Sequence, residues 1–252
     1  MSEQPSETNV HLQKAVEMQF GILHSCNDFI IACDTEMHLV YANPGAYNMT
    51  GYSPEEVGLE LLPELLYDAE TAVRVRELMN LALREGSAQE EAELITKSGA
   101  KLDVQLQLFA IRDADEKTIG LGMILRDITT LRAYQREMLL KSAIVDSCDD
   151  FIAATDQSLN CIYANPYVYE MSGYSPSEIG LDVGPVRMHD ASTAKKISDA
   201  CFDVIQTGGN WHGDSDLLTK YGDIKKIQQK LFPLRDEKGR ITGTGTIIRD
   251  IT

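Results

Sequence analysis

The side chains with the widest chemical repertoire in this sequence are five cysteines, five histidines and one tryptophan. Their spacing does not favour catalysis, because no Cys-x-x-Cys pair occurs and no two histidines stand at metal-ligand spacing. The chain also lacks a nucleophile elbow and a phosphate-binding glycine loop. The sequence therefore predicts no catalytic constellation, no metal site and no intrinsic enzymatic activity.

The cysteines are odd in number and irregularly placed, at Cys26, Cys33, Cys148, Cys161 and Cys201. Free, mostly buried thiols are the ordinary state of cysteine in a reducing cytosol. We expect that state here, and a redox-active disulfide or a metal site is the alternative.

The acidic balance of the chain restricts its partners. Its 252 residues carry a formal net charge of −16, whereas sequence-independent nucleic-acid binding depends on Lys and Arg side chains that neutralise phosphates. Anionic membrane surfaces are disfavoured for the same reason. No apolar run approaches the roughly 18–20 residues that span a bilayer, and the first residues do not resemble a secretory signal. We expect a cytoplasmic protein with no nucleic-acid partner and no membrane span.

The elements that position these side chains occur twice. Tyr41–Leu59 and Tyr163–Leu181 share the pattern Tyr-Ala-Asn-Pro followed by Met-(Thr/Ser)-Gly-Tyr-Ser-Pro, at an offset of 122 residues. One inserted residue after Gly208 changes the offset to 123, at which Arg126–Thr129 matches Arg249–Thr252. Two copies at so long a period indicate duplicated domains rather than a solenoid of short repeats. Each copy, of about 120 residues, is long enough to bury its own core.

Each copy is predicted to fold as two strands, several helices and three strands. In the first copy, alternating apolar residues favour a strand pair at 29–33 and 39–41. Short helices follow, which Gly51 or Gly173 can end in the left-handed conformation, and Ser53 and Ser175 are N-cap candidates. A long helix is expected at 69–85 and at 191–207, each ending at a glycine. The last three strands are expected at 91–96, 101–111 and 119–127 in the first copy and at 214–219, 225–234 and 243–250 in the second.

This order of elements predicts an α+β fold, in which each domain is a five-stranded antiparallel sheet with its helices on one face. We expect a tail and helix at 1–26, a first domain at 27–129, a linker helix at 130–148 and a second domain at 149–252. Residues 1–9 are polar, and we expect them to be disordered.

The two flanking helices, at about 10–24 and 130–147, carry apolar stripes near heptad spacing. In the linker helix the stripe consists of Leu131, Tyr134, Met138 and Val145, and Lys141 interrupts it. Such a stripe can pack on its own domain or pair with the same helix of a second chain. We expect the second arrangement, a homodimer.

The repeated motifs resemble those of the PAS family over nearly all of both halves. The features that carry the resemblance are Tyr-Ala-Asn-Pro, Met-(Thr/Ser)-Gly-Tyr-Ser-Pro, Thr-Lys-x-Gly and a closing Arg-Asp-Ile-Thr, in this order and duplicated. The resemblance implies a sensory or dimerising input domain that holds a small ligand or cofactor between sheet and helices, or none. It also implies an output domain of the histidine kinase, diguanylate cyclase or chemotaxis type, which is absent from this chain because the sequence stops at Thr252.

Two cofactor classes of the family are disfavoured by the residues present. The LOV photosensors carry a cysteine in a Gly-x-Asn-Cys motif, where this chain has Gly58–Leu61 and Gly180–Val183 without cysteine. The haem-binding members place a histidine on the long helix, where this chain has Val75 and Ile197. We expect neither LOV-type FMN photochemistry nor haem.

The second copy has three candidate pocket residues, Trp211, Asn165 and His189. Trp211 resembles the tryptophan of flavin-binding PAS domains, so FAD in the second domain is one hypothesis, and a half-buried aromatic residue at a strand start is the other. Asn165 either fixes a turn or contacts the pocket, and His189 either lies in a turn or contacts the pocket. In the first copy we align Gln89 with Trp211 and Tyr67 with His189.

Three hypotheses on function remain open: a ligand-binding sensory input module, an FAD-dependent redox sensor, and a ligand-free scaffold for dimerisation and docking. We expect any ligand to lie in the second domain. There Val183–Pro185 replaces Leu61–Pro63, and the first domain has more leucines with which to fill its interior.

Overall fold

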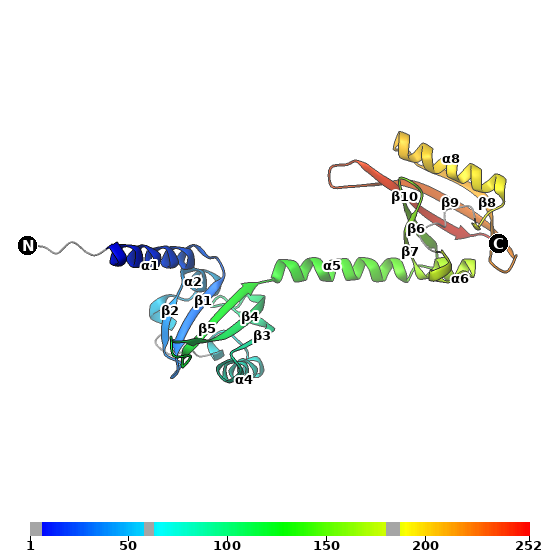
Figure 1. Cartoon of the computed structure of the whole chain (residues 1–252). Coiled ribbons are helices and arrows are strands. Elements are labelled where there is room, and N and C mark those ends of the chain that lie inside the picture. Colours follow the sequence, from blue (N-terminus) through cyan, green and yellow to red (C-terminus); the bar gives the residue numbers. More distant parts are fainter. Residues whose placement is uncertain (1–6, 58–62, 180–186) are drawn as a thin grey trace, which may run out of the picture. The chain divides into compact units, whose positions relative to one another are not determined.

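The computed structural model of the chain describes residues 7–57, 63–179 and 187–252. It has two compact units, which divide between Arg136 and Glu137. Each unit contains one five-stranded antiparallel sheet, and the two sheets share no strand (Figure 1). The predicted tandem α+β architecture is therefore confirmed.

The first domain follows the predicted order of elements. Its elements are α1 (Glu7–Ser25), β1 (Phe29–Asp34), β2 (Leu39–Ala42), α2 (Pro44–Thr50), α3 (Pro54–Val57), the 3₁₀ helix η1 (Pro63–Leu65), α4 (Ala69–Glu85), β3 (Ser87–Ile95), β4 (Lys101–Arg112) and β5 (Thr118–Asp127). The strands lie in the order β2-β1-β5-β4-β3. The first and last strands of the domain thus lie side by side at the centre of the sheet.

The second domain repeats this order. Its elements are α5 (Thr129–Asp146), β6 (Phe151–Asp156), β7 (Cys161–Ala164), α6 (Pro166–Ser172), α7 (Pro176–Ile179), α8 (Ala191–Thr207), β8 (Trp211–Leu218), β9 (Ile224–Arg235) and β10 (Ile241–Asp250). The strand order is β7-β6-β10-β9-β8. None of the helices in the described ranges has the length and apolarity that a bilayer crossing requires.

The long helices begin and end where the sequence predicts. Asp68 caps the start of α4 by accepting a hydrogen bond from the Thr71 amide at 2.8 Å, and Asp190 accepts from the Ser192 amide at 2.9 Å at the start of α8. At the other end, Gly208 adopts a left-handed conformation with φ 70°. These local signals mark the bounds of α4 and α8, and packing on the sheets stabilises the helices between them.

The short helices also follow their local signals. Gly51 and Gly173 end α2 and α6 with φ values of 77° and 76°. Before α7, the carboxylate of Glu178 accepts a hydrogen bond from the Ser175 amide at 2.9 Å, and Ser53 forms the corresponding bond with Glu56 at 3.0 Å. In a capping box, the side chain of the third helical residue accepts a hydrogen bond from the N-cap amide, and both bonds are of this kind.

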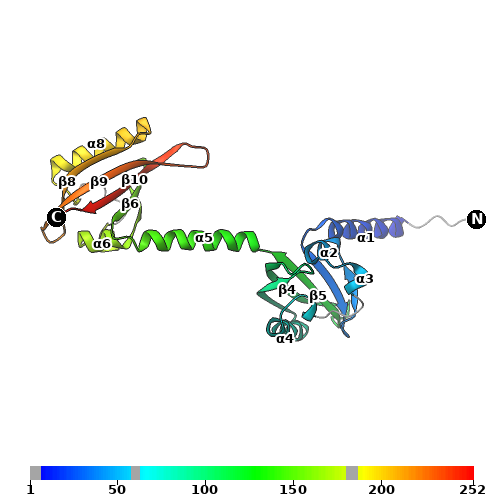
Figure 2. The ribbon, with the colours of Figure 1, turned by 180° about the vertical axis from the view of Figure 1, so that it is seen from behind.

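The core of each domain lies between the sheet and its long helix. In both views α4 lies along one face of the first sheet and α8 along one face of the second (Figure 1 and Figure 2). In the first domain the inward residues of α4 pack on alternate residues of three adjacent strands; among them are Ala72, Val75, Met79, Phe29, Ile31, Val104, Leu106, Leu108, Leu121, Met123 and Leu125. The two-residue period of the strands explains why one face is apolar throughout.

Some boundaries differ from the sequence prediction. The edge strands β3 and β8 begin at Ser87 and Trp211, three to four residues earlier than expected. Ala88 is the one apolar residue at 87–90, and Trp211 is the one large apolar residue at 211–213, so the apolar alternation that marks a strand is weak there. Helix α1 begins at Glu7, so residues 7–9 are helical and the expectation of disorder over 1–9 is wrong for them; residues 1–6 lie outside the described ranges.

Candidate functional site

A cavity of about 80 Å³ lies in the second domain between the sheet and α8. A volume of this size corresponds to about three water molecules. Its wall is mostly apolar with a few polar side chains, and consists of Phe151, Ala153, Thr155, Leu159, Cys161, Ala164, Val168, Met188, His189, Ile197, Cys201, Gln229, Leu231, Thr244, Thr246 and Ile248. The cavity in the core of the first domain is smaller, at about 30 Å³.

The repeat explains why the second cavity is larger and more polar. Equivalent positions on the inner face of the two sheets carry smaller or more polar residues in the second domain. The pairs are Ala153 for Ile31, Thr155 for Cys33, Gln229 for Leu106, Thr244 for Leu121 and Thr246 for Met123. In the first domain these apolar side chains fill the interior.

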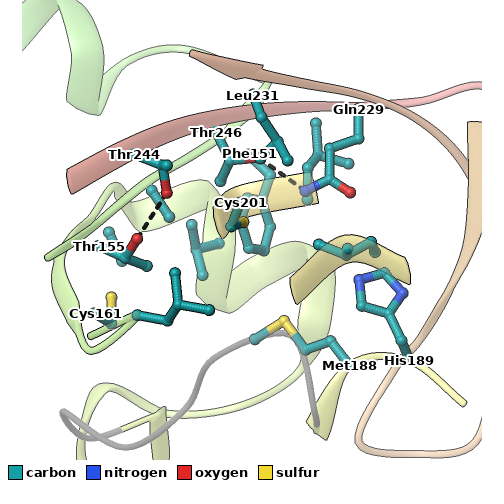
Figure 3. Close-up of a pocket in the computed structure, with 16 residues that line it drawn as sticks. Phe151, Thr155, Cys161, Met188, His189, Cys201, Gln229, Leu231, Thr244 and Thr246 are labelled. Atoms are coloured by element: carbon teal, nitrogen blue, oxygen red, sulfur yellow. Dashed lines mark hydrogen bonds between the residues drawn. The ribbon is translucent and has the colours of Figure 1, made fainter. Parts of the chain in front are cut away.

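Four polar residues of the cavity wall, Thr155, Gln229, Thr244 and Thr246, come from β6, β9 and β10 (Figure 3). Thr155 on β6 and Thr244 on β10 join their hydroxyls at 2.8 Å. On β9, the Gln229 amide nitrogen donates to the Thr246 hydroxyl at 3.0 Å. The Gln229 side-chain oxygen is buried and has no hydrogen-bond partner among the described residues. An unpaired buried acceptor of this kind is costly.

His189 adds a ring to the cavity wall just before α8. Its Nδ1 donates to the Asp216 carbonyl oxygen at 2.7 Å, which leaves Nε2 as an acceptor in the neutral ring. Burial lowers the pKa of His189, an effect that the Asp216 carbonyl and the nearby Asp190 carboxylate partly offset. The ring is therefore neutral at pH 7.

Two cysteines of the wall are protonated thiols. Burial raises the pKa of Cys201, and burial also raises that of Cys161. Outside the cavity wall, in the first domain, burial and the neighbouring Asp34 raise the pKa of Cys33 to about 11. All five cysteines are unpaired. The described wall of the cavity thus carries no charged side chain at neutral pH.

The structure separates the three predicted pocket residues. His189 lies in the cavity wall, whereas Trp211 and Asn165 do not. Trp211 packs beside the cluster of Ile197, Cys201, Val204 and Leu231, and the Lys196 ammonium lies 5.8 Å from the centre of its ring. A role for the three residues in ligand binding stays a prediction.

The counterpart of Trp211 in the first domain is Ala88, and the match to Gln89 is wrong. Trp211 pairs with Leu231 across the sheet, and Ala88 pairs with the equivalent Leu108. The inserted residue precedes Trp211, so the offset at the tryptophan is already 123.

Asn165 is completely buried and joins three segments of the second domain. Its side-chain oxygen accepts from the Ile152 amide of β6 at 3.0 Å. Its amide nitrogen donates to the carbonyls of Val145, Cys148 and Asp150 at 3.2, 3.4 and 3.0 Å. Because Val145 is in the last turn of α5, the side chain ties the end of that helix to the sheet.

In the first domain, Asn43 ties the end of α1 to the domain in the same way. Its amide nitrogen donates to carbonyls at the end of α1 and beyond it, Leu23, Cys26 and Asp28, at 3.2, 3.1 and 2.9 Å. In the second domain a further contact strengthens the link, because the Tyr163 hydroxyl donates to Asp146 at 2.7 Å. Burial and Asp146 raise the pKa of Tyr163 to about 12.

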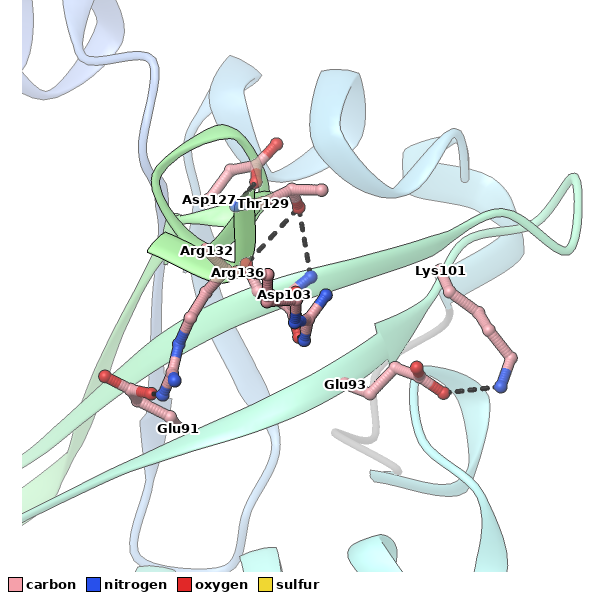
Figure 4. Close-up of polar contacts among 8 residues, drawn as sticks. All are labelled: Glu91, Glu93, Lys101, Asp103, Asp127, Thr129, Arg132 and Arg136. Atoms are coloured by element: carbon pink, nitrogen blue, oxygen red, sulfur yellow. Dashed lines mark hydrogen bonds and ion pairs between the residues drawn. The ribbon is translucent and has the colours of Figure 1, made fainter. Parts of the chain in front are cut away.

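The start of α5 is held on the sheet of the first domain (Figure 4). The Thr129 hydroxyl accepts from the Asp103 amide at 3.0 Å. Arg136 pairs with the Asp103 carboxylate at 3.1 Å, and Arg132 pairs with Glu91. Each ion pair is partly exposed and is worth no more than about 1 kcal/mol, so this attachment is weaker than the buried one at Asn165.

The predicted dimer stripe lies on the surface of α5. Leu131, Tyr134 and Met138 are 55%, 63% and 66% exposed, and Val145 is half-buried. On α1, Met18 and Phe20 are 60% and 54% exposed. Pairing through these helices stays a prediction.

One group of carboxylates and a histidine lies close enough together to hold a cation. It consists of Asp34, Glu36 and His38 in the turn between β1 and β2. Asp34 Oδ1 already accepts from the backbone amides of Glu36 and His38, each at 2.9 Å, so the turn itself explains the grouping.

The residues missed by the sequence analysis are Gln229, Thr155, Thr244 and Thr246. Their signal was present, since each replaces an apolar residue of the first copy, at an offset of 122 for Thr155 and of 123 for the other three. Two predictions concern residues outside the described ranges. These are the LOV motif positions and the contrast between Leu61–Pro63 and Val183–Pro185, of which Pro63 alone is described.

Comparison with known proteins gives one family for both halves. The family model described as PAS fold matches residues 23–133 and 145–252. No curated protein matches this chain at a significant level.

Several solved structures are similar to parts of the chain. The PAS domain of a protein from Colwellia psychrerythraea is 24% identical, with coverage of 46% of this chain and 97% of that one and a TM-score of 0.42. The PAS domain of an HTR-like protein from Haloarcula marismortui is 17% identical, with coverage of 49% and 100% and a TM-score of 0.40. The VqmA dimer of Vibrio cholerae is 21% identical, with coverage of 45% and 52% and a TM-score of 0.41.

Proposed function

Since the chain belongs to the PAS fold family, we propose that it is a sensory input module whose second domain binds a small molecule in the cavity under α8. The observation that carries this proposal is Gln229 in the wall of the cavity, whose side-chain oxygen is buried and has no hydrogen-bond partner among the described residues. A fold that needed only a stable core would place leucine there, as the first domain does with Leu106. Ligand pockets are mostly apolar with a few placed polar groups, and this cavity fits that description.

The route from the cavity to an output runs, in this proposal, through the flanking helices. Asn165 ties the end of α5 to β6, and β6 contributes Phe151, Ala153 and Thr155 to the cavity wall. A ligand that shifts β6 changes the hydrogen bonds that hold the helix end. Binding then biases the population of two arrangements of α5.

The same helices serve dimerisation in the proposal. The exposed apolar residues of α5, Leu131, Tyr134 and Met138, support pairing with a second copy of the chain. A homodimer would let a change at one helix end alter the pairing of both chains. The output is a histidine kinase, a diguanylate cyclase or a chemotaxis-type domain, and the chain itself supplies sensing rather than catalysis.

The FAD hypothesis stays a prediction that the described cavity does not favour. Trp211, on which it rests, packs outside the cavity wall, and a three-ring flavin is larger than a space of about 80 Å³. A ligand-free scaffold is the outcome if the cavity binds nothing.

A thermal-melt screen of the full chain tests the proposal. The library consists of small uncharged metabolites, and the control is Ala153→Ile, which places the first domain's residue in the cavity. Compounds that raise the melting temperature of the wild type but not of Ala153→Ile support binding in the second domain. Compounds that stabilise both equally, or a screen without any stabilising compound, would refute it.

A further inference from the structure

Within the described residues, the side-chain oxygen of Gln229 is an acceptor in the cavity wall of the second domain that lacks a donor. Gln229 is 3% exposed, and its amide nitrogen is engaged by Thr246 at 3.0 Å. Its amide oxygen has no partner in the described part of the chain. A buried carbonyl oxygen that is left unpaired has lost its hydrogen bonds to water without gaining another. A ligand that donates a hydrogen bond to this oxygen would compensate for that loss.

The fold does not require an amide at this place. Gln229 pairs with Ile248 across β9 and β10, and in the first domain Leu106 pairs with Leu125 at the same register. Leu106 is fully buried there. The amide is therefore compatible with the fold but unnecessary for it, which points to a role in recognition.

The wall also indicates the charge of the occupant. Its described titratable groups are His189, Cys161 and Cys201. Burial lowers the pKa of the histidine and raises the pKa of both thiols, so all three are neutral at pH 7. A charged ligand would lose its hydration and find no counter-charge among these residues.

The size of the cavity limits the occupant further. A volume of about 80 Å³ restricts the occupant to a small molecule of about five non-hydrogen atoms. Most of the wall is aliphatic or aromatic, so the occupant is apolar over most of its surface.

We propose that the cavity selects a small uncharged molecule that is largely apolar and donates an N–H or O–H hydrogen bond to the side-chain oxygen of Gln229. The proposal rests on the proposed function and adds the chemical class of the ligand and the residue that selects it. In Figure 3 the Thr155–Thr244 pair and Gln229 lie at opposite sides of the cavity. The hydroxyl pair therefore leaves the Gln229 oxygen free for the ligand.

Pyrrole and furan make a matched pair of probes. Both are flat five-membered rings with five non-hydrogen atoms, but only pyrrole has an N–H donor. Ligand-observed NMR titration of the full chain gives a Kd for each. We expect pyrrole to bind about tenfold more tightly than furan, which corresponds to about 1.4 kcal/mol.

Gln229→Leu should reduce this ratio to about one, because the donor then finds no acceptor. Gln229→Met, which keeps an unbranched side chain, serves as a second variant if the leucine disturbs the fold. Gln228→Leu is the matched control, since Gln228 is exposed on the opposite face of the same strand; it should keep the wild-type ratio.

The outcomes separate this inference from the proposed function. Equal binding of both probes, or a pyrrole preference that survives both Gln229 variants, overturns the ligand class but leaves ligand binding intact. A preference for furan means that the amide presents its nitrogen, which also overturns the class. Binding of neither probe overturns the inference and the proposed small-molecule site together, with water as the remaining occupant.

Discussion

Removal of the Asn165 side chain should loosen the end of α5 from the second domain. Asn165→Ala deletes four hydrogen bonds from a completely buried position. At about 1 kcal/mol net for each bond, the loss is about 3–5 kcal/mol once the unpaired Ile152 amide is included. This is a large part of the roughly 5–15 kcal/mol that stabilises a typical domain. The second domain should therefore be strongly destabilised and the first unaffected.

Hydrogen exchange of the full chain, read by mass spectrometry, measures this effect locally. Exchange should accelerate most over residues 141–152, where α5 ends and β6 begins. It should accelerate less at the start of α5, which Arg132 and Arg136 hold on the first domain. Exchange in β1 and β5 should not change.

Two further variants make the test sharper. Asn160→Ala removes a single hydrogen bond, to Asp156 at 3.0 Å, and should cost less than about 1 kcal/mol. Asn165→Asp keeps the shape but places a carboxylate against three carbonyls, so its stability should recover as pH falls and the carboxyl is protonated. If Asn165→Ala loses less than about 1 kcal/mol, or exchange rises equally in both domains, the assigned role of this side chain is wrong.

Three other outcomes follow from the structure. Ala153→Ile, which copies Ile31 of the first domain, should stabilise the second domain by up to about 2 kcal/mol in a chemical unfolding experiment, at about 0.8 kcal/mol for each buried methylene; destabilisation would mean that the cavity cannot accept the side chain. His189 has a lowered pKa in the folded state, so the unfolded chain takes up a proton near pH 6.5 that the folded chain resists, and stability falls as pH falls below that value. His189→Gln should remove this part of the pH dependence, which amounts to at most about 1.4 kcal/mol per pH unit; an unchanged slope between pH 7.5 and 5.5 would contradict it. Replacement of both Leu131 and Met138 with Glu should convert a dimer to a monomer in light scattering, and a monomeric wild type would count against the predicted pairing.

Much of the fold could be predicted because local signals and the repeat agree. Terminal glycines and apolar periodicity predict α4 and α8 to the residue. The duplication then shows that the same order of elements is used twice. Where the prediction of secondary structure was wrong, at the starts of β3 and β8, apolar residues are too few to mark the two-residue period of a strand.

The candidate site was harder to predict. Taken alone, Gln229 and Thr244 look like ordinary strand residues. They stand out as polar substitutions only when they are compared with their apolar counterparts in the first copy. The repeat identifies the elements at once, but the substitutions become visible only when every inward position of the two copies is compared. Asn165 was expected either to fix a turn or to contact the pocket, but three of its four partners lie 15 to 20 residues away, beyond what local spacing can indicate.

The most direct test of the account is to observe which domain a ligand enters. In a chain with ¹³C-labelled methionine methyl groups, Met188 reports on the second cavity, and Met79 and Met123 report on the core of the first domain. Addition of pyrrole, an aromatic ring, should shift the Met188 methyl signal in a saturable way and leave the Met79 and Met123 signals in place. An unchanged Met188 signal, or shifts confined to Met79 and Met123, would contradict the assignment of sensing to the second domain.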